Sequence, residues 1–174
     1  MDLKYPIGKY QKPDLINLEN VNKWGKDLGE FPTKLKLIIQ NFSEEMLLTK
    51  TLPGNWTVAT IIHHLADSHS NSLTRMKLAL TEDNPTIKPY DETAWGKLND
   101  SLDSDIEPSL KILEGVHKKM EILSINLKEE DLNRTYFHPE SGSKGSLGGL
   151  FPMYVWHGNH HLEHIKLLKE KQNW

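Results

Sequence analysis

The chain contains no cysteine among its 174 residues. This absence excludes disulfide bonds, thiolate metal ligands and a cysteine nucleophile, so histidine and the carboxylates are the strong metal ligands that remain. A chain without cysteine is also compatible with the reducing cytoplasm, which is where we expect the protein.

Long hydrophobic runs are missing as well. No stretch approaches the roughly 20 apolar residues that a membrane-spanning helix needs. The segment from Met1 to Pro6 has no apolar core of the kind that signal peptides carry. We therefore expect neither a membrane span nor secretion.

Charge of one sign does not dominate either. The 21 basic and 24 acidic residues are scattered along the chain and give a net charge of −3. No basic stripe is present that would neutralise a phosphate backbone, so we do not expect nucleic acid as a partner. With 37% hydrophobic residues the composition is that of a globular protein, and the length suits a single domain spanning residues 1–174.

Four long segments repeat apolar residues at spacings of three and four, which predicts amphipathic helices. They cover residues 19–42, 57–81, 105–127 and 150–171. Pro32 lies inside the first segment and predicts a break or kink there. Residues 1–18 contain prolines and a glycine and predict an extended amino-terminal arm.

The connections refine this prediction to an all-α four-helix bundle. Pro53-Gly54-Asn55 is typical of a turn, and Thr57 is a good N-cap for the second helix. The connection near residues 82–104, with room for a short helix over 91–98, exceeds the about 2–8 residues usual between bundle helices. It therefore predicts a long crossover between two parallel helices. A short hairpin through 135–137 is expected in the loop before the last helix.

Histidines are concentrated in two short segments. Seven of the nine lie there, namely His63, His64, His69, His157, His160, His161 and His164. On the last helix the positions 150, 154, 157, 161, 164 and 168 alternate steps of four and three, a pattern that faces a bundle interior. His157 and His161 lie about 40° apart on this face, and histidines at this spacing can bind one metal.

Alternatives remain open at this point. A single buried histidine is more often a hydrogen-bonded core residue, but several on one face favour a metal, because protonation would bury repelling charges. His160 and His164 have the same spacing, although His160 is rotated about 60° away from His157. For the third ligand, periodicity favours His69, with His64 second. Gly158 after His157 excludes the His-Glu-x-x-His motif of zinc proteases.

Several motifs resemble the DinB/YfiT family of bacterial metal-binding helical bundles, in order and over nearly the whole chain. They are Tyr5-Pro6-Ile7-Gly8, Gly54-Asn55-Trp56-Thr57-Val58, Ile61-Ile62-His63-His64-Leu65-Ala66-Asp67-Ser68-His69, Pro89-Tyr90-Asp91-Glu92, Phe137-His138-Pro139 and Tyr154-Val155-Trp156-His157-Gly158-Asn159-His160-His161. The resemblance implies an up-down-down-up bundle, a homodimer, and one Zn²⁺ or Ni²⁺ per subunit. It places the metal ligands on His64, His157 and His161.

Three imidazoles leave a metal with an open position, as in catalytic sites. Such a metal can lower the pKa of a bound water to near 7 or bind a thiol as thiolate. The resemblance implies a metal-dependent hydrolase of a small-molecule substrate; the alternatives are a thiol S-transferase of the bacillithiol type and a non-enzymatic metal-binding stress protein. Asp67 is a candidate to support a ligand imidazole or receive a proton, although a surface carboxylate is an equally good interpretation.

Overall fold

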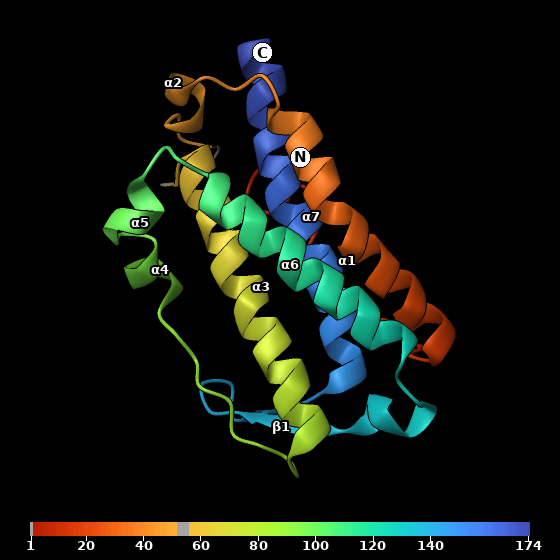
Figure 1. The fold of residues 1–174 in the computed structure, drawn as a ribbon. Helices are drawn as coiled ribbons and strands as arrows, with labels where there is room; N and C mark the ends of the chain where they lie inside the picture. The colour runs from red at the N-terminus through yellow and green to blue at the C-terminus, as the bar shows by residue number, and fades with distance from the viewer. Residues whose placement is uncertain (1, 52–55) are drawn as a thin grey trace.

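The structure is a computed structural model, and it describes residues 2–51 and 56–174. Four long helices form a bundle: α1 (Leu18–Ile39), α3 (Val58–Thr81), α6 (Glu107–Ile125) and α7 (Leu147–Gln172). In the view of Figure 1, α1 runs up, α3 and α6 run down and α7 runs up. This is the up-down-down-up four-helix bundle that the sequence predicts. α1 and α3 each pack against both α6 and α7.

The long crossover joins α3 to its parallel neighbour α6 (Figure 1), as predicted. It carries two short helices, α4 (Glu92–Trp95) and α5 (Asn99–Leu102), where the sequence suggested one helix over 91–98. Another short helix, α2 (Glu44–Leu47), follows α1. The predicted turn at Pro53-Gly54-Asn55 lies outside the described residues.

Side-chain caps set the starts of three bundle helices. Asn17 accepts the backbone N–H of Asn20 at α1, and Thr57 accepts that of Thr60 at α3, as its N-cap position predicts. Ser146 accepts from Gly149, so α7 begins at Leu147, three residues earlier than expected. The loop before α7 forms a 3-10 turn (Glu129–Asn133) and an antiparallel hairpin of β1 (Thr135–His138) and β2 (Ser143–Ser146).

The first helix runs through Pro32 without a break, so of the predicted break or kink the break is wrong and the kink stays a prediction. Proline removes one hydrogen bond from a helix, to the carbonyl four residues before it. In α1 that carbonyl belongs to Leu28, and it accepts a hydrogen bond from His117 of α6 instead. The helix also begins at Leu18, so the amino-terminal arm ends one residue before the predicted limit.

The apolar core is divided into two clusters. One contains Ile62, Leu113 and Ile165 near the carboxyl end of the chain, and the other contains Met120 and Phe151 near the hairpin. Buried histidines of α3, α6 and α7 lie where the two clusters meet. We call this level of the bundle, formed by His64, His69, His117, His157 and His161, the histidine layer.

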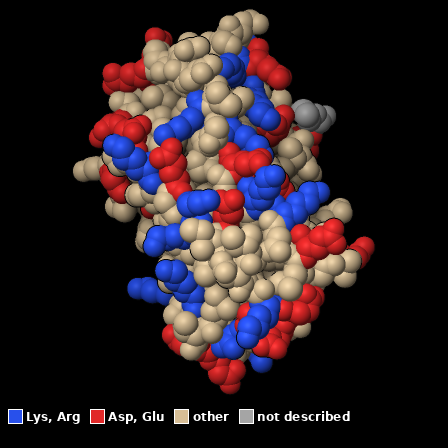
Figure 2. Space-filling model, turned by 45° about the vertical axis from the view of Figure 1, so that its right-hand side comes forward, with Lys and Arg blue, Asp and Glu red and all other residues tan. Residues whose placement is uncertain are grey.

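No helix among the described residues is long and apolar enough to cross a membrane. On the face drawn in Figure 2, basic and acidic side chains are interspersed and neither sign covers a continuous area. The scattered charges of the sequence predict such a surface.

Candidate metal centre

Two antiparallel helices bring three histidines together. α3 supplies His64, and α7 supplies His157 and His161. One ring nitrogen from each lies within 4.8 Å of the other two. These are the three residues that the resemblance to the DinB/YfiT family selects. That they bind a metal stays a prediction.

The geometry of this group fits a metal. Nε2 of His64 and Nε2 of His157 are 3.3 Å apart. A tetrahedral zinc with bonds of about 2.0–2.1 Å to imidazole places two ligand nitrogens about 3.3 Å apart. Within the described residues the group has three members, without a fourth histidine or a carboxylate. Nδ1 of His161 is buried and has no hydrogen-bond partner there.

Burial keeps these imidazoles neutral. It lowers the pKa of His64 to about 4. Burial and the neighbouring histidines also lower the pKa of His157 and of His161 well below 6.5. Metals bind the neutral form of histidine, so the three side chains need lose no proton at neutral pH.

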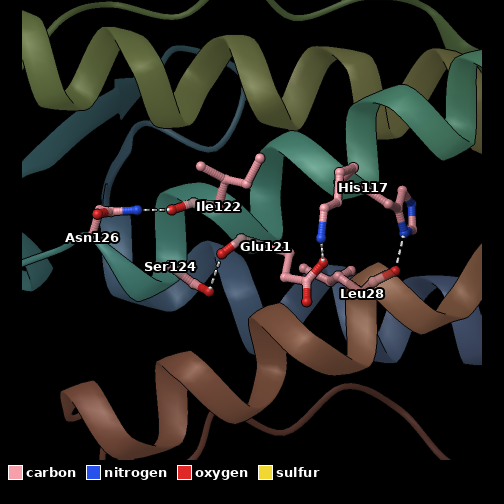
Figure 3. A network of polar contacts seen from close by, with 7 residues as sticks. Leu28, His117, Glu121, Ile122, Ser124 and Asn126 are labelled. Atoms are coloured by element: carbon pink, nitrogen blue, oxygen red, sulfur yellow. Dashed lines mark hydrogen bonds and ion pairs between the residues drawn. The ribbon is translucent and has the colours of Figure 1, made fainter.

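Two further histidines lie behind His157. Nε2 of His69 is 3.1 Å from Nδ1 of His157, and Nδ1 of His69 is 2.8 Å from Nε2 of His117. Periodicity favoured His69 as the third ligand and correctly placed it inside the bundle, but its ring contacts the far side of His157. The ring of His117 is directed at the carbonyl oxygen of Leu28 (Figure 3). Its Nδ1 lies 2.6 Å from that oxygen.

His117 is the buried histidine that sequence reasoning missed. A signal for it was present, because positions 110, 113, 117 and 120 continue one interior face of α6 at the spacing of three and four. It lies outside the two histidine-rich segments, and those segments alone supplied the candidates.

His63 is buried on α3 but faces away from the group. Its Nδ1 accepts a hydrogen bond from the Ser109 hydroxyl at 2.8 Å, and its Nε2 donates to the Asp103 carbonyl at 3.1 Å. These bonds satisfy both ring nitrogens. His63 is therefore a structural residue that ties α3 to the crossover and to α6.

The alternative pair on α7, His160 and His164, lies beside His161 of the group, with ring centroids 5.1 and 6.2 Å from that of His161. Nε2 of His160 and Nε2 of His164 are 3.3 Å apart. The ring of His160 stacks on Trp156, with centroids 4.9 Å apart, and lies 5.9 Å from the ring of Tyr5 in the amino-terminal arm. Both histidines line a cavity beside the candidate centre.

Two cavities flank the three histidines. The larger has a volume of about 890 Å³ and is lined by His161, Tyr5 and Trp56, whose ring centroid is 4.7 Å from that of His64. The smaller, about 390 Å³, is lined by His157 and by Arg75. The candidate centre therefore has open space on two sides.

Asp67 is half-buried on α3, and burial raises its pKa, with Asp100 adding to the shift. Within the described residues no hydrogen bond joins it to the three histidines. A supporting role for Asp67 stays a prediction.

A helical bundle in which three neutral histidines converge beside a cavity has the architecture of a small metalloprotein. A model of the DinB superfamily matches residues 29–165. The chain therefore belongs to the DinB superfamily, as its motifs predicted.

Relatives cover the chain from end to end. A protein of Oceanobacillus iheyensis, named "Putative metal-dependent hydrolase", is 44% identical over 174 residues, which is 100% of both chains. YfiT of Bacillus subtilis carries the same description and is 40% identical over 100% of this chain and 98% of that protein. A solved structure described as "YfiT from Bacillus subtilis is a probable metal-dependent hydrolase with an unusual four-helix bundle topology" matches with a TM-score of 0.95, at 40% identity, over 100% of this chain and 99% of that chain.

Proposed function

We propose that the protein is a metal-dependent hydrolase of a small-molecule substrate, with one Zn²⁺ or Ni²⁺ held by His64, His157 and His161. The observation that carries the proposal is the group of three histidines, one of which, His161, lines a cavity of about 890 Å³. A fourth protein ligand would favour a closed structural site, and the group has three members among the described residues. The names of the relatives support the same activity.

A divalent metal bound there supplies a Lewis acid that activates water or a thiol at neutral pH. The protein's own residues bind and shield the substrate. Trp56 and Ile61 form apolar walls of the larger cavity, and the buried imidazoles keep the metal-binding nitrogens free of protons. The cavity size fits a small molecule, since ligand sites typically measure about 300–1,000 Å³.

A second function has its own supporting observation. One cavity is lined by His161 and a second by His157, and two such spaces could hold two reactants, as transfer of a low-molecular-weight thiol to an electrophile requires. The chain has no cysteine, so the sulfur nucleophile has to come from a free thiol. The metal would hold this thiol as its thiolate.

Elemental analysis of the gently purified protein, followed by paired assays, tests the proposal. The hydrolase should cleave activated esters without added thiol, at a rate that rises with pH, and His64→Ala should abolish the activity. The transferase should conjugate an electrophile such as 1-chloro-2,4-dinitrobenzene only when a thiol is added. Thiol-dependent conjugation with no hydrolysis across a broad ester and amide panel would replace the first function by the second. Failure of both assays by metal-loaded protein would favour the non-enzymatic metal-binding protein.

A further inference from the structure

A chain of hydrogen bonds crosses the bundle behind the candidate metal centre. It runs from the Leu28 carbonyl to His117, from His117 to His69 and from His69 to His157, with distances of 2.6, 2.8 and 3.1 Å. Each of the four long helices contributes one member. The side chains of His69 and His117 are 0% exposed.

A proline makes the first acceptor available. In an unbroken α-helix the carbonyl of residue 28 would accept the N–H of residue 32. Pro32 has no N–H, and it lies buried inside α1. The Leu28 carbonyl is therefore free to accept from His117 (Figure 3).

The Leu28 carbonyl then determines which ring nitrogen carries the proton in each of the three linked imidazoles, His117, His69 and His157. A carbonyl can only accept, so Nδ1 of His117 must donate, and a neutral imidazole has a single N–H. Nε2 of His117 must then accept from Nδ1 of His69. By the same step Nε2 of His69 accepts from Nδ1 of His157, which leaves a lone pair on Nε2 of His157. This is the nitrogen that lies 3.3 Å from Nε2 of His64.

We propose that His69 and His117 are positioning residues that hold His157 in its Nδ1–H form, with the Nε2 lone pair directed at the metal centre. Ligand histidines commonly donate their second ring N–H to a supporting group, which fixes the tautomer and the ring orientation. Here that support consists of two further histidines anchored on a carbonyl released by Pro32. The Leu28 carbonyl of α1 thereby acts on His157 of α7 through side chains of α6 and α3.

Nitrogen NMR of the metal-free protein at neutral pH tests the tautomers directly. We expect His157, His69 and His117 each to carry the proton on Nδ1 and a free lone pair on Nε2. A proton on Nε2 of His157 would overturn the proposal. Pro32→Ala restores the N–H that competes for the Leu28 carbonyl, and it should shift the Nδ1–H signal of His117.

A matched pair of variants separates positioning from packing. His117→Phe keeps a ring against Phe31, whose centroid is 5.3 Å from that of His117, but it can neither donate nor accept. His117→Gln can do both. We expect His117→Phe to weaken Zn²⁺ binding by about 10- to 100-fold in chelator competition, and His117→Gln to recover most of that loss. His63→Gln is the control, because His63 is a buried histidine that takes no part in these hydrogen bonds. This variant should bind Zn²⁺ like the wild type. Equal affinity in both His117 variants would overturn the positioning role, because packing alone would then suffice.

An independent observation concerns the larger cavity. Its lining includes three lysines and no carboxylate among the described residues: Lys4, Lys50 and Lys97. None of the three belongs to the ion pairs found there, although six other lysines do. The rest of the lining includes the apolar side chains of Trp56 and Leu102.

We infer that this cavity takes a small molecule with an anionic group on an apolar body. The inference rests on the proposed function for its link to turnover, because His161 also lines the cavity. Unpaired lysines around one opening attract anions and orient them. An apolar wall beside them suits the remainder of such a molecule.

Two matched fluorescent probes test the charge preference in metal-free protein. They are 8-anilinonaphthalene-1-sulfonate and N-phenyl-1-naphthylamine, which lacks the sulfonate. We expect tighter binding of the sulfonate at low salt, a preference that declines as salt screens it. Lys50→Gln or Lys97→Gln should weaken sulfonate binding roughly 2- to 5-fold, while Lys119→Gln on α6, outside the cavity, should not. Equal binding of both probes, or no effect of the cavity lysines, would overturn the inference. Failure of hydrolysis alone would not, since these measurements use no metal.

Discussion

At the scale of residues, we predict that metal binding depends on each of three histidines. Replacing His64, His157 or His161 by alanine should remove one of the three proposed ligands, and we expect a loss of Zn²⁺ affinity larger than the about 10- to 100-fold typical of a supporting residue. His63→Ala is the matched control, because both of its ring nitrogens bond elsewhere. Elemental analysis after dialysis against a weak chelator measures the bound metal. Full occupancy in the His64→Ala protein would contradict the assignment and favour His69.

The site could be predicted from the sequence only in part. Periodicity placed His157 and His161 on the interior face of α7, and the structure has them there. The same reasoning preferred His69 to His64, since His69 lies nearer the middle of the buried face of α3. Periodicity gives the direction of a Cβ but not which ring stands in front of another, and here His69 stands behind His157. Motif resemblance selected His64, which the structure places beside His157 and His161; its role as a ligand stays a prediction.

At the scale of elements, Gly25 allows α1 and α6 to pack closely against each other. A Cβ built on Gly25 would overlap the side chain of Ser124 on α6. We therefore expect Gly25→Ala to destabilise the protein by about 1–3 kcal/mol, measured by chemical denaturation. Gly115→Ala on α6 is the control, since a Cβ there meets nothing within 4 Å. Alanine is the better helix former, so this control should gain about 0.5–1 kcal/mol. A stabilised Gly25→Ala protein would show that the two helices can move apart freely.

The same two helices, α1 and α6, show where the prediction of helices from local sequence fails. Local rules correctly gave the four long helices, the Thr57 cap and the crossover, because these depend on spacing within one segment. Pro32 predicted a break or a kink, yet α1 has no break. The carbonyl that proline leaves free is satisfied by His117, which is 89 residues away in sequence from Leu28. No local rule contains such a partner.

At the scale of the whole molecule, assembly is a prediction that rests on the resemblance. We expect a homodimer, with a mass of twice the chain's 20.0 kDa, in light scattering at micromolar concentration. Ile112 and Ile122 on α6 are 45% and 47% exposed. Burial of such side chains would contribute to a dimer contact. Ile112→Lys together with Ile122→Lys tests this helix face. A monomeric mass for the unaltered protein would contradict the prediction.

At the scale of the whole molecule, we also expect the buried histidine layer to make the fold sensitive to acid. Burial lowers the pKa of His117 to about 4 from an ordinary value of 6.5, with partial compensation from its hydrogen bond to Leu28. Between these two values the unfolded chain binds more protons than the folded one. The free energy of unfolding therefore decreases as pH falls from about 6.5 to about 4, and above 6.5 this group has no further effect.

We expect metal-free protein to lose stability over this interval, by up to about 1.4 kcal/mol per pH unit for each such histidine. His117 faces one titratable group, His69 on α3, and the uncharged Leu28 carbonyl and Phe31 ring on α1. His117→Phe removes one titrating group, so its stability should depend less steeply on pH than that of the wild type. Chemical denaturation at a series of pH values, with a chelator present, measures both slopes. Added Zn²⁺ should stabilise the protein most at the upper end of the series, because protons compete with the metal for the same imidazoles. A wild-type stability that is constant between pH 6.5 and pH 4 would show that the layer admits water and protons without opening the bundle.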